Sequence, residues 1–103
     1  MQQFEIRWYK FDKPDKRRPV LILTRESALE FLGEATIAPI TSTIRNIPTE
    51  VFLGPEDGLK LDCVANFDHI QTVSQSKIGT LIGKLSEEKK EYVHNAIVFA
   101  FGL

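Results

Sequence analysis

The sequence predicts a mainly β fold, a small barrel-like sheet with a short helix after the second strand and a C-terminal helix. Short runs rich in β-branched and aromatic residues recur along the chain, and turn-forming residues separate them. One stretch near the C-terminus instead repeats apolar residues at helical spacing. With 103 residues, 43% of them apolar, the chain can bury a core, and we expect a single domain over residues 1–103.

The first two strands are expected to form a hairpin. Residues 4–11 (FEIRWYKF) place polar residues between aromatic ones, as a strand does. Residues 12–16 (DKPDK) carry turn chemistry. Residues 18–24 (RPVLILT) form the second strand, whose unbroken apolar run predicts burial on both faces.

A short helix and a third strand follow. Residues 25–33 (RESALEFLG) have paired apolar residues and end at a glycine, which indicates a short helix. Residues 35–43 (ATIAPITST) predict a strand. Pro39 removes one donor from the ladder, so we expect an edge or a bulge there.

The next part of the chain holds further short strands. Residues 49–54 predict a strand that runs into the turn GPEDG. Residues 59–67 and 69–73 are two more strand-like pieces, with Asn66 at the break between them. Residues 76–86 stay ambiguous, because the apolar spacing fits a helix and two glycines interrupt it.

The C-terminal helix is the clearest element. We expect Ser86 to cap it, with Glu87 and Glu88 at the positive end of the helix dipole. Gly102 ends the helix. Four residues repeat at helical spacing, namely Val93, Ala96, Ile97 and Ala100.

Charge is unevenly distributed on a chain whose net charge is only −1. Residues 1–25 carry seven Lys/Arg against three Asp/Glu, and residues 26–69 carry two against eight. A basic first segment on a neutral chain indicates a local anion site rather than a wholly basic surface. The longest apolar run is too short for a membrane span, the N-terminus lacks the pattern of a signal peptide, and one cysteine allows no internal disulfide; we therefore expect a cytoplasmic protein.

Arg18 is the first candidate for chemistry. It directly precedes Pro19, which biases its backbone to an extended conformation. The guanidinium fork suits a phosphate because it donates two parallel hydrogen bonds, and Lys16 and Arg17 stand beside it. The alternative is a solvated basic turn.

Hydroxyl groups at the end of the third strand are the second candidate. Thr41 and Ser42 are adjacent, and Thr43 and Arg45 follow them. Such hydroxyls can hold a phosphoryl oxygen or orient an attacking hydroxyl. The alternative is that they only fill a strand and a turn.

The remaining reactive side chains give weaker signals. His69 and His94 are the two histidines, and a histidine pair can serve as general base and acid in a metal-free ribonuclease. We expect His94 to have a structural role in the C-terminal helix and His69 to be more available. Cys63 is expected to be a small buried apolar residue. We predict neither a metal site nor a cofactor site, since no ligand spacing or phosphate-binding motif is present.

The order of these pieces resembles the MazF/PemK family of toxin endoribonucleases. The resemblance spans roughly residues 4–101. It is carried, in chain order, by RRPVLIL, IAPITSTI, VFLGPEDGLKLDCVANFDHIQTVSQSKIG and IGKLSEE before the closing helix. The third of these motifs is the most diagnostic, because its spacing from PITS also fits.

The resemblance implies a fold, an activity and partners. The fold is a small SH3-like barrel of the CcdB/MazF plasmid-toxin type that forms a homodimer. The activity is metal-independent cleavage of single-stranded RNA at short sequences, as in an mRNA interferase that inhibits growth. The partner is a cognate antitoxin whose flexible, often acidic tail covers the RNA groove.

The resemblance also assigns roles to residues of this chain. The catalytic arginine falls on Arg18, the catalytic threonine on Thr41, and a residue that contacts RNA on His69. The family pattern usually has Gln at position 69, Arg at position 71 and Ser at position 63, where this chain has His, Gln and Cys. The loop between the first two strands is shorter here than in longer members. These departures concern base preference more than chemistry, because Arg18 and Thr41 remain.

These residues permit attack by a ribose 2′-hydroxyl on the adjacent phosphate. Arg18 would stabilise the charge that develops on the phosphoryl oxygens, and Thr41 would hold the phosphate or the 2′-hydroxyl in line. A guanidinium stays protonated and is a poor base. Either Arg18 acts mainly through its charge, or it is unusually perturbed, or His69 assists.

Binding would use further side chains. Lys16, Arg17, Ser42 and Arg45 are expected to contact or steer the RNA backbone. Trp8 and Tyr9 either stack on unpaired bases or belong to the core of the first strand.

Two other functions remain open at this stage. One is a non-catalytic toxin of the same fold that acts on DNA gyrase, as CcdB-like proteins do. The other is an SH3-like binding module. Neither uses an arginine at a buried strand together with paired hydroxyls, so retention of Arg18 and Thr41 favours the ribonuclease.

Overall fold

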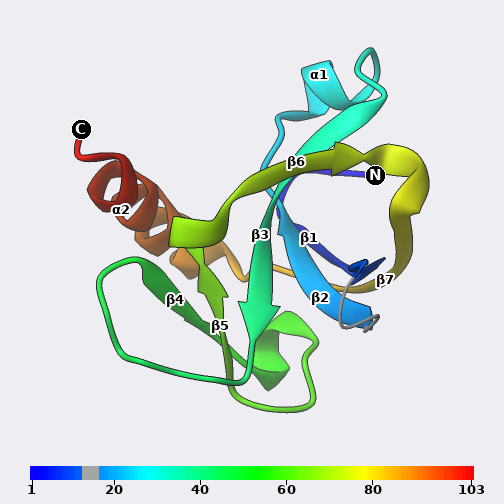
Figure 1. Ribbon diagram of the computed structural model, residues 1–103. Coiled ribbons are helices and arrows are strands. Elements are labelled where there is room, and N and C mark those ends of the chain that lie inside the picture. The colour runs from blue at the N-terminus through cyan, green and yellow to red at the C-terminus, as the bar shows by residue number, and fades with distance from the viewer. Residues whose placement is uncertain (13–16) are drawn as a thin grey trace.

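The computed structural model describes residues 1–12 and 17–103. Most of the turn expected at residues 12–16 lies outside these ranges, and so does the candidate RNA-binding residue Lys16. Figure 1 shows the described chain as a sheet with one long helix at the C-terminus and a short helix after the second strand.

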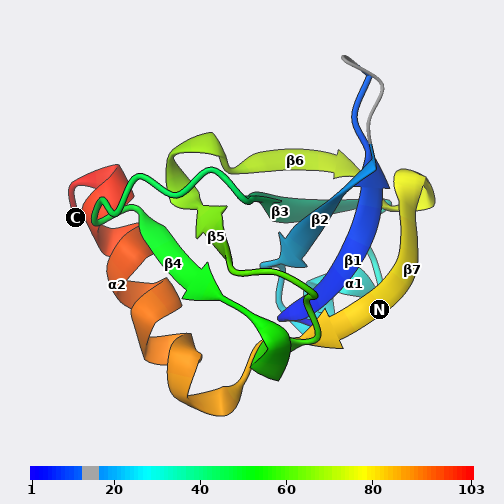
Figure 2. The same cartoon turned by 90° about the horizontal axis from the view of Figure 1, so that it is seen from below.

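In the described part of the chain, seven antiparallel strands form the sheet, which confirms the mainly β prediction. The order along it is β4-β5-β3-β2-β1-β7, and β6 pairs with β3 beyond the end of β5. Figure 2 shows the sheet curving from β4 at one end to β7 at the other. The strands are β1 (Glu5–Lys10), β2 (Arg17–Ile22), β3 (Glu34–Thr41), β4 (Glu50–Leu53), β5 (Cys63–Asn66), β6 (Gln71–Ser74) and β7 (Ile78–Lys84).

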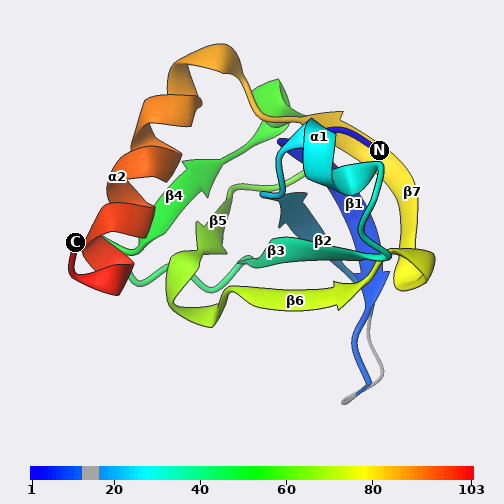
Figure 3. The same ribbon diagram turned by 90° about the horizontal axis from the view of Figure 1, so that it is seen from above.

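Within residues 1–12 and 17–103, two α-helices accompany the sheet. α1 (Glu26–Leu29) is a single turn, shorter than the helix expected over residues 25–33. α2 (Lys90–Phe101) lies against β4, as Figure 3 shows. Among the described residues no helix is long and apolar enough to cross a membrane. Short 3₁₀ turns occur at η1 (Pro55–Asp57), η2 (Phe67–His69), η3 (Gln75–Lys77) and η4 (Glu87–Lys89).

β2 is buried on both faces, as its apolar run predicted. Leu21 packs into a cluster that includes Ile6 of β1 and Val93 of α2. Val20 and Ile22 point the other way, into a second cluster formed with neighbouring strands. Alternate side chains of a strand leave opposite faces, so a strand between two clusters needs apolar residues at every position.

Of the edge or bulge expected at Pro39, the edge is wrong. β3 is an internal strand, and Pro39 lies opposite Val20 of β2. On the other side of β3, pairing with β6 ends at Ile37 and pairing with β5 begins at Ile40. Pro39 occupies the interruption between these two ladders, where a missing donor is tolerated.

In two segments the secondary structure differs from what the sequence pattern indicated. The ambiguous stretch 76–86 holds a strand, β7, whose register against β1 shifts twice. Only Cys63–Asn66 of the strand-like run 59–67 is a strand, and residues 59–62 form a loop. Asn66 does mark the break, because its side chain accepts a 2.9 Å hydrogen bond from the backbone N–H of Asp68 and caps η2.

The C-terminal helix is confirmed, but its expected cap is not. Val93 and Ala96 are buried, and Gly102 ends the helix with a left-handed backbone (φ 69°). Ser86 makes no side-chain capping bond. Its backbone N–H instead donates to Oδ1 of Asp57 at 2.9 Å, since the chain turns through η4 before the α-helix begins.

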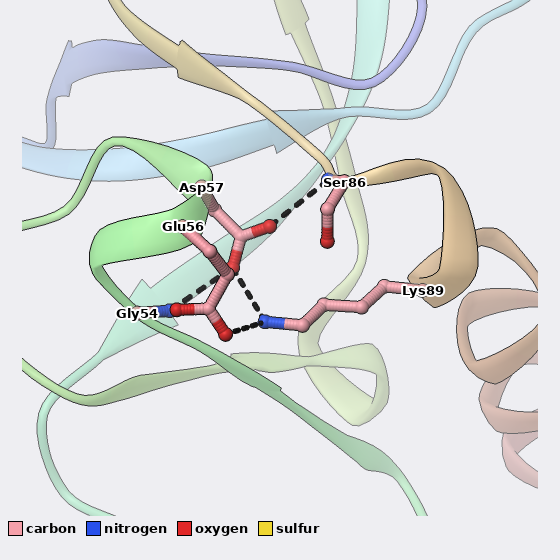
Figure 4. A network of polar contacts seen from close by, with 5 residues as sticks. All are labelled: Gly54, Glu56, Asp57, Ser86 and Lys89. Carbon is pink, nitrogen blue, oxygen red and sulfur yellow. Dashed lines mark hydrogen bonds and ion pairs between the residues drawn. The ribbon is translucent and has the colours of Figure 1, made fainter.

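Asp57 fastens the start of this helical region to the sheet (Figure 4). Its side chain is fully buried and accepts from the backbone N–H of Gly54 at 3.0 Å as well as from Ser86. Lys89 Nζ completes the network at 2.6 Å from Asp57 Oδ2 and 2.8 Å from Glu56 Oε2. A buried carboxylate with several donors and a cation is a satisfied one.

Candidate functional site

A pocket of about 740 Å³ lies where β1, through Trp8, meets four further segments of the chain. β2 and β3 supply one side, and β7 and the loop between η1 and β5 supply the other. Its volume is within the range of ligand-binding sites in proteins. The described residues that line it are Trp8, Arg18, Pro19, Ile40, Thr41, Ser42, Thr43, Gly58, Leu59, Lys60, Leu61, Cys63, Leu81 and Ile82.

The pocket brings together Arg18 and Thr41, the two residues expected to be catalytic. Val20 pairs with Pro39 across β2 and β3, and extending this antiparallel register by two residues sets Arg18 opposite Thr41. Both side chains are half-buried. Among the described residues the Arg18 guanidinium has no hydrogen bond or ion pair, so its donors are available to a ligand.

Hydroxyl groups continue from Thr41 along the rim. Thr41 Oγ1 accepts a hydrogen bond from the backbone N–H of Thr43 at 3.2 Å, which fixes the oxygen and leaves its proton free to donate. Ser42 and Thr43 are exposed and line the same pocket. Three adjacent hydroxyls at the end of β3 therefore face the space beside Arg18.

Lys60 adds a second cation to the pocket, and the sequence reasoning missed it. It stands in the loop that follows the GPEDG turn and is exposed. No aspartate or glutamate lines the pocket in the part of the chain that the structure describes. Asp62 stands next to the wall residue Cys63 but does not itself line the pocket. Two lining cations and no lining carboxylate make the pocket suited to an anion.

The two aromatic candidates of β1 have different positions. Tyr9 is buried in the core, where its ring meets Phe11 edge-on, so it cannot stack on a base. Trp8 lines the pocket, and the guanidinium of Arg17 lies 4.8 Å from the centre of its ring. Arg17 thus covers one part of the indole by a cation–π contact.

Two glycines set the loop that carries Lys60. Gly58 has a left-handed backbone (φ 95°) that L side chains rarely adopt. Gly83 of β7 lies against η1, where a Cβ would overlap the carbonyl oxygen of Asp57 and lie 2.9 Å from the Cα of Gly58. This close approach places the loop beside β7 and closes that side of the pocket.

Cys63 is buried at the pocket wall, as expected of a small apolar residue. Burial, together with the nearby carboxylate of Asp62, raises the pKa of its thiol. The thiol is therefore protonated at neutral pH and adds no negative charge to the site.

The other candidate residues lie outside the pocket. Arg45 is exposed in the loop between β3 and β4, and its backbone N–H donates to Glu50 Oε1 at 3.0 Å. His69 is exposed at the end of η2, past the far end of β5 from the pocket. His94 lies on α2, where it is exposed, and it does not line the pocket, so the structural role expected of it stays a prediction. Within residues 1–12 and 17–103, no group of three His, Cys, Asp or Glu side chains is placed to hold a metal ion.

Comparison with known proteins places this chain and its fold in one family. Residues 2–101 match the family described as PemK-like, MazF-like toxin of type II toxin-antitoxin system. Endoribonuclease MazF3 of Mycobacterium tuberculosis is 42% identical over 89 residues, which cover 86% of each chain. The probable endoribonuclease MazF5 of the same organism is 33% identical over 82% of this chain and 78% of its own.

Solved structures agree. The Mycobacterium tuberculosis toxin MazF-mt6 superposes with a TM-score of 0.90 at 38% identity, covering 96% of this chain and 97% of that one. An endoribonuclease from a mycobacterial species, solved in complex with its cognate antitoxin, gives 0.88 at 25% identity and covers 100% and 96%. The chain belongs to the PemK-like, MazF-like family of toxins of type II toxin–antitoxin systems.

Proposed function

We propose that this protein is the toxin of a type II toxin–antitoxin pair and acts as an endoribonuclease. Its substrate is single-stranded RNA, in particular mRNA, which it cuts at short sequences without a metal ion or cofactor. The observation that carries the proposal is the pocket in which Arg18 and Thr41 meet on neighbouring strands. The relatives named endoribonuclease favour this function over a gyrase inhibitor or a plain binding module.

The reaction is attack by a ribose 2′-oxygen on the adjacent phosphorus. A bond from the 2′-oxygen to phosphorus forms, and the bond from phosphorus to the 5′-oxygen breaks. The 2′-hydroxyl gives its proton to a base, and the departing 5′-oxygen gains a proton. The products are a 2′,3′-cyclic phosphate and a 5′-hydroxyl end. DNA is not cleaved because it lacks the nucleophile.

Arg18 and Thr41 have different roles in this step. Negative charge grows on the phosphoryl oxygens, and the free guanidinium of Arg18 stabilises it, an effect typically worth ~10²–10³ in rate. Thr41, with its oxygen fixed by the Thr43 N–H, donates its proton to the phosphate and holds it in line with the 2′-oxygen. His69 lies outside the pocket, so in this chain it does not serve as the base there.

The remaining cations and hydrogen-bond donors are proposed to bind the RNA on either side of the phosphate that is cleaved. Lys60 neutralises a phosphate within the pocket, and Ser42 donates a hydrogen bond there. Arg17, and Lys16 outside the described residues, gather the RNA near the start of β2. Arg45 and His69 do not line the pocket, and we propose that they contact flanking nucleotides.

Partner proteins complete the proposal. A cognate antitoxin occludes the pocket, whose two cations and lack of carboxylates suit an acidic segment. The toxin itself is a homodimer. Its dimer surface is formed by β4 and α2, where exposed Phe52, Tyr92 and Phe99 surround a second hollow of about 450 Å³. We place the protein in the cytoplasm with its mRNA substrate.

The test is RNA cleavage in EDTA by wild type, Arg18→Ala and Thr41→Ala, with mapping of the product ends. We expect cuts at a recurring short sequence, cyclic phosphate ends, and a loss of at least ~100-fold in each variant. Arg25→Ala and Thr72→Ala are matched controls, because both side chains are exposed away from the pocket. They should cleave as wild type does.

The opposite result is equally clear. A folded dimer that leaves diverse single-stranded RNAs intact would contradict the proposal and turn attention to gyrase. Equal cleavage by Arg18→Ala and Arg25→Ala would remove Arg18 from the chemistry even if RNA is cut.

A further inference from the structure

The pocket has an apolar half that the proposed chemistry does not use. Leu61, in the loop after η1, is 67% exposed, and Leu81, on β7, is 55% exposed. The two leucines come from segments 20 residues apart in the sequence and line the same hollow together with Trp8. Exposed leucines are ordinary when scattered singly, but a pair converging on one pocket indicates a ligand surface.

The charge of the pocket limits the chemical class of ligand that it can bind. The apolar half adjoins Arg18 and Lys60, and among the described residues no carboxylate faces it. A ligand that fits must therefore combine an anionic group with a flat or apolar group only a few bonds away. A nucleotide has this composition, and unpaired bases in single strands bury their faces against apolar and aromatic side chains.

We propose that Leu61 and Leu81 form a slot for one base of the RNA, the base next to the phosphate that Arg18 binds. The inference rests on the proposed function and adds a specificity-determining site to it. The base enters between the two leucines with its edge toward Trp8, whose ring is already covered in part by Arg17. The slot thereby sets which nucleotide occupies the position beside the cut.

The slot also explains the construction of the loop that carries Leu61. Gly58 and Gly83 let η1 approach β7 closely, which brings Leu61 to the same pocket as Leu81. The loop residues 60–62 are exposed and contribute little to the core. Exposure of a large apolar side chain at a fixed position is consistent with a contact made only when RNA is bound.

The experiment pairs leucine variants with abasic substrates. An oligonucleotide with the mapped cleavage sequence is compared with versions that lack one base at each position around the cut. We expect Leu61→Ala and Leu81→Ala each to lower kcat/KM about tenfold on the intact substrate. On the substrate abasic at the slot position, both variants should match wild type, because the contact is already absent.

Leu32→Ala is the matched control. Leu32 is 54% exposed, nearly as much as Leu81, but it lies after α1 and lines a different hollow. It should behave as wild type on every substrate. Equal kcat/KM for the Leu61, Leu81 and Leu32 variants would overturn the slot, and so would a tenfold loss that persists on every abasic substrate.

A second readout does not depend on cleavage. Trp8 is the only tryptophan of the chain, so its fluorescence reports occupancy of this pocket alone. Oligonucleotides with 2′-deoxy sugars cannot be cut, and removal of the slot base should weaken their binding about tenfold to wild type but not to Leu61→Ala. If wild type cuts RNA but loss of the slot base weakens binding to wild type and to Leu61→Ala equally, the slot proposal is wrong and the proposed function is unaffected. If it binds with coupling but never cuts, the proposed function fails and the slot stands.

Discussion

Among single residues that the structure describes, Asp57 is the most deeply buried charged side chain. Burial raises the pKa of its carboxyl, but the hydrogen bond from Lys89 and those from the backbone of Ser86 and Gly54 outweigh burial, so the pKa lies below its usual range. The same contacts from Asp57 and Glu56 outweigh burial at Lys89 and raise its pKa. Both groups are therefore charged in the folded protein across the neutral range.

The first prediction concerns Asp57→Asn. This change leaves Lys89 buried without its main partner and should lower the free energy of unfolding by about 3 kcal/mol at pH 7. Glu56→Gln is the control, since Glu56 is an exposed partner of the same lysine, and it should have little effect. Urea unfolding followed by circular dichroism measures both; equal midpoints for the two variants would contradict the assignment.

The pH dependence of this difference is a second, separable prediction. Because the folded pKa of Asp57 is lowered, its contribution to stability is full above the ordinary aspartate pKa of about 4 and is lost as the pH falls through the folded value. The stability gap between wild type and Asp57→Asn should therefore shrink below about pH 4. A gap that stays constant down to pH 2 would show that the carboxylate charge is not its cause.

At the scale of elements, the packing of η1 on β7 shapes one side of the pocket. Gly83 lies so near the backbone of Asp57 and Gly58 that no side chain fits between them. The glycines of residues 76–86 made this stretch hard to assign from sequence, because they interrupt a helical apolar pattern. Gly83 is required by its contact with η1, which lies more than 20 residues earlier in the chain, whereas Gly79 lies against Trp8 of β1.

Gly83→Ala tests this packing. The added methyl group must push η1 away from β7, and we expect a loss of about 1–3 kcal/mol in unfolding free energy together with weaker RNA cleavage. Gly33→Ala is the control, because a Cβ there meets no atom within 4 Å. It should be neutral or slightly stabilising. Comparable thermal midpoints for the two variants would disprove the close approach.

At the scale of the whole molecule, sequence reasoning predicted the elements better than their meeting points. The hairpin of β1 and β2, the doubly buried β2 and the C-terminal helix follow from local patterns and are confirmed. Arg18 and Thr41 were candidates from their residue types and neighbours, the family motif assigned their roles, and both line one pocket. Lys60, Leu61 and Leu81 were missed, since nothing local shows that a loop and a distant strand share a pocket. The only signal in the sequence was Leu61, a large apolar residue that closely follows the GPEDG turn.

The last prediction concerns the oligomeric state and tests whether α2 and β4 form the proposed dimer surface. Phe99→Asp places a charge among the exposed aromatic residues of α2 and β4 and should convert the proposed dimer to a folded monomer. Phe31→Asp is the control, because Phe31 is more exposed still but follows α1. Sedimentation velocity at micromolar concentration distinguishes the two. A dimer that survives Phe99→Asp places the dimer surface elsewhere.

The network at Asp57 joins parts of the molecule that have different tasks. On one side it holds η1, from which the pocket loop departs, and on the other it holds Lys89, at the threshold of α2. Loosening the first turn of the helix therefore also releases the wall of the pocket, and the reverse holds as well. An antitoxin that binds this helix and loosens it would lower the activity from a distance, without contacting the pocket in which we propose that RNA binds.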